Sequence, residues 1–499
     1  MLYETIQKMT KDEARNFRLQ MERVSRTDDK KTILLYELLR ESTTKPSTST
    51  VTKKLYGQDN ATERNNLYSI RRRLMREIKR SMLHQYFEID HEQQALNEFS
   101  FAKVQRKNGN LQLCKSALIA CLKIARKHDL FEIMEMVFKE LLNLAPDDQT
   151  IEVDEIIKLR TENSIKMMQI RESHNKIAHA IQMLRKSNFS RGDPKILKIL
   201  EEVRSVSISQ EAFYHSSKGR IRLFNLTSGI LLRQGAFDQL ERYLKLEYAF
   251  FQEKKLFDRN THRTKIIMLS WLVNATYKNN KFQESLDYCF EMRDAMEMYS
   301  RRFFNSFIGH LFNSFVNNYV CLDRLSDALS IQLDLIENEK ANLRGSTEVF
   351  IHLNLVAVYF YMGKVSKALK ALSNVKILDS FKSLDPSIHL QIEIFESVLR
   401  FEDEDFEYVQ TLVGHIKKNY SNKLPLQPSE NKFLSILMKL SENRLIGSKK
   451  KEKEILRESI DHFKPGMSPE GNLIDYGLWL SSCEVGKSYH ILRLKDLME

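Results

Sequence analysis

A helix-pair pattern recurs about every 40 residues in the middle of this chain, between residues 220 and 420. Each copy has a small or apolar residue where two antiparallel helices would pack closely. These residues follow one another at intervals of 40 to 45 and are Leu240, Ser285, Ala328, Ala368 and Val409. A period of this length is typical of stacked helical hairpins, none of which could bury its apolar face alone. The sequence therefore predicts an α-solenoid.

Turn-forming residues are scarce, with 15 glycines and 8 prolines among 499 residues. Sheet-rich folds use more of both residue types in their turns, whereas the residues that dominate this chain favour helices. Hydrophobic residues make up 42% of the chain, which is sufficient for packed cores. We therefore expect an all-α protein.

Changes in the pattern of apolar, charged and turn-forming residues divide the chain into four parts. We expect a small helical domain, then helical hairpins with a long helix, then the repeats, then C-terminal capping helices, over residues 1–90, 91–219, 220–420 and 421–499. Residues 150–188 are either one long helix or two joined helices, and residues 188–195 form a plausible break.

The first part contains three expected helices, over residues 28–41, 49–59 and 61–87. In the first, the apolar spacing predicts that Ile33, Leu34 and Leu38 face inward, with Tyr36 as a further candidate. The second ends at Gly57, a residue that readily adopts the left-handed conformation found after helices. In the third, a single buried stripe is predicted from Leu67, Ile70, Leu74 and Ile78.

The best copy of the central pattern resembles the tetratricopeptide repeat. That family has a leucine, an aromatic, a corner glycine and a close-packing alanine where this chain has Leu355, Tyr359, Gly363 and Ala368. Val356 stands where the family has a small residue, and the other copies keep two or three of these positions. The resemblance implies a concave surface that binds peptides or partner domains.

The N-terminal part is similar to the winged-helix module of bacterial regulators that carry such repeats. The similarity covers the short helix at Lys53, Lys54, Leu55, Tyr56 and Gly57, and an arginine-rich recognition helix at residues 65–76. It implies DNA binding. No β-hairpin pattern follows Met82, where that family has its wing.

Six basic residues and one acid, Glu77, lie between residues 71 and 80. With Leu74 and Ile78 facing inward, a row of cations could follow a phosphate backbone: Arg72, Arg76, Lys79 and Arg80. Side chains able to bond base edges or phosphates precede them, at Asn65, Asn66 and Ser69. The alternative is a solvated basic surface, or one that docks on an acidic protein.

A second cluster of arginine and aromatic residues consists of Arg301, Arg302 and Phe303. Further aromatics follow at spacings of three and four, which is the pattern of a core helix. The alternative is a groove in which the three residues bind an extended acidic or aromatic peptide.

The sequence contains no phosphate-binding glycine loop, dinucleotide turn, zinc-protease motif or nucleophile elbow. We therefore expect no enzyme, metal site or cofactor. No stretch of 18 uncharged apolar residues occurs and the start lacks a secretory signal, so we expect a cytoplasmic protein without a membrane partner, its five cysteines reduced.

Two functions follow from these observations. The first is a non-catalytic scaffold whose repeats bind a protein or peptide. The alternative is a transcriptional regulator that binds DNA through its N-terminal domain and uses the repeats for sensing or oligomerisation. The net charge of +12 is compatible with either, and the sequence predicts neither the biological process nor the oligomeric state.

Overall fold

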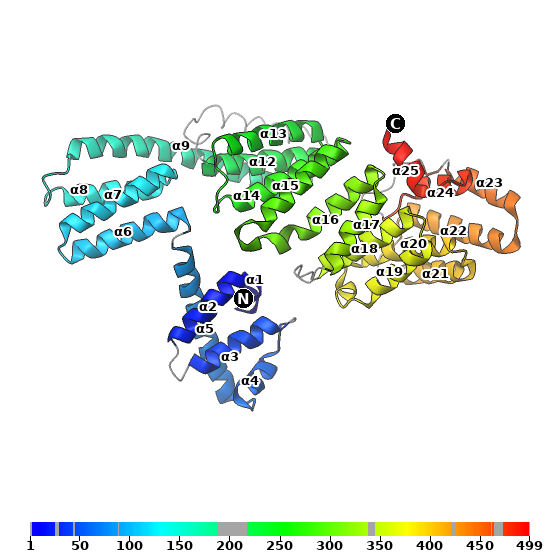
Figure 1. Cartoon of the computed structure of the whole chain (residues 1–499), viewed down its shortest axis with the longest axis horizontal. Helices are drawn as coiled ribbons and strands as arrows, with labels where there is room; N and C mark the ends of the chain where they lie inside the picture. The colour runs from blue at the N-terminus through cyan, green and yellow to red at the C-terminus, as the bar shows by residue number, and fades with distance from the viewer. Residues whose placement is uncertain are drawn as a thin grey trace. The chain divides into compact units, whose positions relative to one another are not determined.

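The computed structural model describes residues 2–24, 29–42, 45–87, 89–186, 217–337, 345–420, 426–460, 462–463 and 473–498. All regular structure in these ranges is helical, with no β-strand, which confirms the all-α prediction (Figure 1). The chain divides into two compact units, Met1–Lys265 and Ile266–Glu499. The expected break at 188–195 lies outside the described residues.

The first unit begins with five helices around one core. They are α1 (Leu2–Lys8), α2 (Lys11–Val24), α3 (Asp29–Glu41), α4 (Thr48–Tyr56) and α5 (Ala61–Tyr86). Side chains from all five form this core, including Ile6, Phe17, Leu35, Val51 and Leu67. As expected, Tyr36 is buried in this core and Ile33 and Leu38 pack against it, whereas Leu34 is 46% exposed. Leu35 and Leu39 of α3 are also buried in the core.

The further helices described in this unit are α6 (His91–Lys107), α7 (Leu111–Lys127), α8 (Phe131–Leu144), α9 (Val153–Lys186), α12 (Ser217–Gln234) and α13 (Phe237–Glu253). A winged-helix module has a β-hairpin after its recognition helix. In this chain the element that follows α5 is helix α6. Helix α9 is continuous over 34 residues, so the long segment is one helix within its described part. Helix α14 (His262–Lys278) crosses the boundary between the two units.

The second unit continues with successive helices that pack on their neighbours in sequence (Figure 1). They are α15 (Phe282–Arg301), α16 (Phe304–Cys321), α17 (Leu325–Glu337), α18 (Ser346–Tyr361), α19 (Val365–Ile377), η1 (Phe381–Ser383), α20 (Pro386–Glu402), α21 (Phe406–Asn419), α22 (Pro428–Ile446), α23 (Lys449–Ile460), α24 (Tyr476–Val485) and α25 (Tyr489–Met498). A shared core runs from Val349 to Tyr489 and includes Trp479, which is fully buried. Packing of each helix on its neighbours is consistent with the predicted solenoid.

The five repeat positions have the same place in the structure. Each is the fourth residue of its helix, in α13, α15, α17, α19 and α21, and each is at most 1% exposed. Five residues before each of them the backbone is left-handed, at Gly235, Asn280, Asp323, Gly363 and Glu404, with φ between 56° and 68°. The repeat is therefore a helix–corner–helix unit in which a left-handed residue ends the first helix and the close-packing residue follows one turn into the second.

All five cysteines are free thiols, and four of them are buried. Within the described ranges, no helix combines the length and the apolar composition that crossing a bilayer requires.

Candidate nucleic-acid interface

Helix α5 packs on α2, α3 and α4. Leu67, Leu74 and Ile78 of α5 are 0% exposed and join the core with Leu35 of α3 and Val51 of α4. Two N-caps mark the start of the short helix α4 and the start of the long helix α5. The Ser47 hydroxyl accepts from the amide of Thr50 at 3.1 Å, and the Asn60 side chain accepts from the amide of Glu63 at 2.8 Å.

The connection between α4 and α5 is a tight turn. Gly57 has φ +76°, and its amide donates to the carbonyl of Lys53, as expected for a helix that ends at glycine. Arg64 donates from Nε and Nη2 to the two carboxylate oxygens of Asp59, at 2.7 and 2.8 Å. These hydrogen bonds lower the pKa of Asp59, so the pair stays charged and Arg64 is held at the turn.

The structure brings together all seven residues predicted to contact nucleic acid. Their side chains are exposed on α5, with the polar group in the first half and the cations in the second: Asn65, Asn66, Ser69, Arg72, Arg76, Lys79 and Arg80. The buried stripe lies on the other side of the same helix, because residues three and four apart share a face. This arrangement confirms the predicted orientation of the helix, whereas nucleic-acid binding itself stays a prediction.

One carboxylate reduces the positive charge of this surface. Glu77 Oε1 lies 3.5 Å from Arg76 Nε and 3.3 Å from Arg80 Nη1, so both arginines share it. Arg72 and Lys79 have no ion-pair partner among the described residues. The two groups of cations therefore differ in how much of their charge is already neutralised within the protein.

Sequence analysis missed a groove beside these cations. It has a volume of about 450 Å³ and is lined by Leu2 and Met75 as well as by Arg71, Arg72, Arg76 and Lys79. Tyr68 completes it, with a side chain that is 55% exposed and a ring 5.9 Å from the Arg71 guanidinium. The exposed position of Tyr68, one residue after the buried Leu67, was available from the helical spacing, whereas the approach of Leu2 depends on tertiary packing.

The second predicted cluster lies at the corner between α15 and α16. Arg301 lies 3.6 Å over the ring of Phe304 and 3.2 Å from the carboxylate of Glu297. The Arg302 guanidinium is 5.3 Å from the ring of Phe303. The structure thus brings Arg301, Arg302 and Phe303 together, but Arg301 interacts with its own helix and its neighbour. Peptide binding at this corner stays a prediction.

No protein-family model matches this chain, and the comparison with curated proteins finds no similar sequence. A functional proposal for it therefore depends on its own residues.

Proposed function

We propose that the N-terminal helices of this protein bind duplex DNA, with α4 and α5 as a helix-turn-helix and α5 as the recognition helix. One observation carries this proposal: seven polar and basic side chains share the exposed face of a helix whose other face is buried. A helix about 10–12 Å in diameter fits the major groove of B-DNA, which is about 12 Å wide.

Two kinds of contact follow from the order of residues along α5. Asn65, Asn66 and Ser69 are near the N-terminus of the helix, which is the part that reaches base edges in helix-turn-helix proteins. The cations of the second half would neutralise phosphates, which contributes most of the affinity and none of the sequence preference. The first helix of such a pair crosses the backbone, and α4 has exposed Lys53 and Lys54.

The test is fluorescence anisotropy of the full chain with a labelled mixed-sequence duplex over a series of salt concentrations. Four phosphate contacts predict a slope of log affinity against log salt of about −3 to −4. The variant Arg72→Gln, Arg76→Gln, Lys79→Gln, Arg80→Gln should lose this binding because its counterion release is removed.

A matched control removes four other exposed cations, from α23: Lys449→Gln, Lys450→Gln, Lys451→Gln, Lys453→Gln. Both variants lose the same net charge, so the control should keep its affinity if α5 is the interface. Equal losses in the two variants would indicate attraction by net charge alone. Absence of binding at low salt would reject DNA as the ligand.

We also propose a second function, the binding of a protein or peptide by the helical hairpins, because α9 has an exposed apolar surface. Ile157, Ile165 and Met168 are 48%, 51% and 65% exposed along this helix. Exposed apolar surfaces on helices are common sites of protein contact. The variant Ile165→Glu, Met168→Glu should lose a partner that the wild type retains, with unchanged DNA binding. A partner that binds both forms equally would reject this surface.

A further inference from the structure

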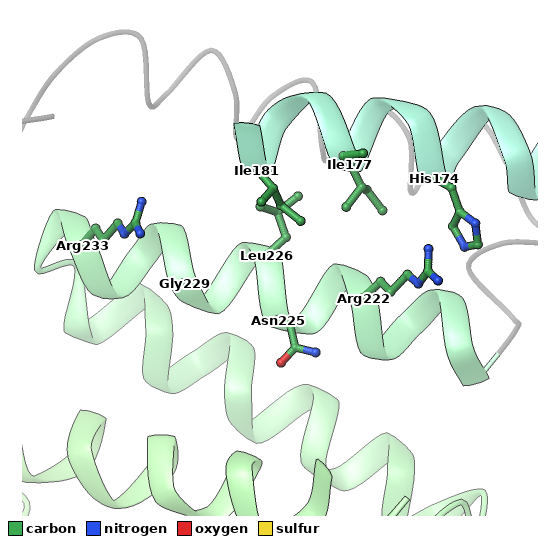
Figure 2. A pocket seen from close by; sticks show the side chains of 9 residues that line it. His174, Ile177, Ile181, Arg222, Asn225, Leu226, Gly229 and Arg233 are labelled. Carbon is green, nitrogen blue, oxygen red and sulfur yellow. The ribbon is translucent and has the colours of Figure 1, made fainter. Parts of the chain in front are cut away.

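A groove separates α9 from α12 in the first unit, outside the surface proposed to bind DNA. The two helices lie side by side and run in the same direction, and a cavity of about 480 Å³ opens between them (Figure 2). Known small-molecule sites have volumes of about 300–1,000 Å³. The groove is therefore large enough for a ligand of low molecular mass.

The floor of this groove is apolar. Ile177 of α9 and Leu226 of α12 are 4% and 5% exposed, and Figure 2 shows Leu226 directed toward α9 near Ile181. These side chains form a continuous apolar strip along the two helices. Such a strip suits a hydrocarbon chain rather than a polar body.

Gly229 lines the same groove in the interior of α12. Glycine in a helix interior costs about 1 kcal/mol relative to alanine. Packing by the described residues does not require glycine at this position, because an added Cβ would meet none of their atoms within 4 Å. The missing side chain leaves open space at the end of the apolar strip, where a bound molecule could extend.

Basic residues lie at both ends of the groove. Figure 2 shows Arg222 and His174 directed toward one another at one end and Arg233 at the other. Burial, and then the charge of Arg222, lower the pKa of His174, although Glu132 of α8 acts in the opposite direction. This lowering favours the neutral form of the His174 imidazole. None of the described residues that line the groove is acidic.

We propose that this groove binds a small amphipathic anion, with its head group at Arg222 and its apolar chain on Ile177 and Leu226, extending toward Gly229. Guanidinium groups bind carboxylates and phosphates with paired hydrogen bonds, so either head group fits. The distance from Arg222 to Gly229 is seven residues of helix, or about 10 Å, which sets the length of the chain. This site does not depend on the proposed DNA binding.

Isothermal titration calorimetry of the full chain tests the proposal with four probes that share an eight-carbon chain. Octanoate and octyl phosphate should bind, and the ratio of their affinities distinguishes a carboxylate ligand from a phosphate ligand. Octanol and octylammonium should bind at least about tenfold more weakly because they lack the anionic group. Acetate and inorganic phosphate, which lack the chain, should give no measurable binding.

Two substitutions test the two halves of the site. Arg222→Gln removes an exposed cation and should weaken octanoate binding about tenfold without affecting the fold. Gly229→Leu should fill the groove and abolish binding, whereas Gly229→Ala, which occupies only the open Cβ position, should stabilise α12 and weaken binding less. Arg242→Gln, an exposed arginine of α13 that does not line the groove, is the matched control.

Circular dichroism confirms that each variant is folded before its affinity is interpreted. Equal affinity for octanol and octanoate would reject the role of the cations. Unchanged binding in both Arg222→Gln and Gly229→Leu would reject the groove as the site, and absence of binding by every probe would reject the proposal as a whole.

Discussion

Two clusters of arginine and aromatic residues look alike in the sequence and differ in the structure. On α5, Arg72 and Lys79 are exposed beside Tyr68 and have no ion-pair partner among the described residues. At the corner between α15 and α16, Arg301 is 29% exposed, stacks on Phe304 and pairs with Glu297. A cationic side chain can bind a ligand with its full charge only where it is not already paired with a carboxylate of the same protein.

Backbone geometry accounts for this difference. Helix α5 is regular, so its cations project outward at helical spacing, away from the buried stripe. Near Arg301 the chain changes direction through three left-handed residues, Tyr299, Ser300 and Arg301, with φ of 51°, 58° and 57°. This change of direction places the Arg301 guanidinium over the ring of Phe304, the first residue of α16. In an uninterrupted helix the side chain of Arg301 would point in a different direction.

The largest expected effect is the difference in lost stability between substitutions on the buried face and on the exposed face of α5. Leu74→Ala removes a fully buried side chain and should cost about 2–5 kcal/mol of local stability. Arg72→Gln on the exposed face should change stability by less than about 0.5 kcal/mol. Hydrogen exchange of the amides in α3, α4 and α5 measures both values. Similar costs would mean that Arg72 is part of the packing rather than of a free surface.

At the corner between α15 and α16, substitution of an arginine should reduce the stability of the protein and leave DNA binding unchanged. Arg301→Gln removes the stacking on Phe304 and the ion pair with Glu297, and should cost about 1–2 kcal/mol. Hydrogen exchange in α15 and α16 measures this loss, and the affinity for DNA should not change. The exposed neighbour Arg302→Gln is the control, with a smaller expected cost. A variant that is as stable as the wild type would restore Arg301 as a candidate for ligand binding.

Removing Glu77, the acid that lies between the cations of α5, should sharpen the contrast further. Glu77→Gln releases Arg76 and Arg80 from their shared carboxylate and should raise the affinity for duplex DNA about threefold at low salt. The gain should diminish as salt is added. Glu458→Gln on the exposed side of α23 removes the same charge at another place and should have little effect. Equal gains in both would show that only net charge matters.

The smallest effect concerns the carboxyl group of Glu402, which accepts a hydrogen bond from Trp479. The indole Nε1 of Trp479 donates to Glu402 Oε1 at 2.8 Å, and burial raises the pKa of Glu402. The folded protein therefore binds a proton more readily than the unfolded chain between the two pKa values, and this contribution to stability falls as the pH rises through that window.

Glu402→Gln should remove this part of the pH dependence. Unfolding followed by tryptophan fluorescence at a series of pH values gives the difference between wild type and variant. Glu407→Gln, an exposed residue of α21, should leave the slope as it is. An unchanged slope in Glu402→Gln would mean that the carboxyl is solvated in the folded protein.

Much of the helical architecture could be predicted because helices depend on local spacing and local capping. The end of α4 at Gly57, the buried stripe of α5 and the five close-packing positions all follow from residues a few positions apart. The failure at α3 has the same physical origin. Its run of apolar residues permits two inward faces, and packing selected Leu35 and Leu39 in place of Leu34.

The sequence by itself determined the all-helical fold, the period of the hairpins and the exposed row of cations on α5, because each depends on interactions within one or two turns of a helix. Tertiary structure decided which cations remain available and where grooves form. The groove between α9 and α12 joins residues such as Ile177 and Leu226, almost 50 positions apart. Contacts over that separation depend on the packing of whole helices, which no local pattern of residues specifies.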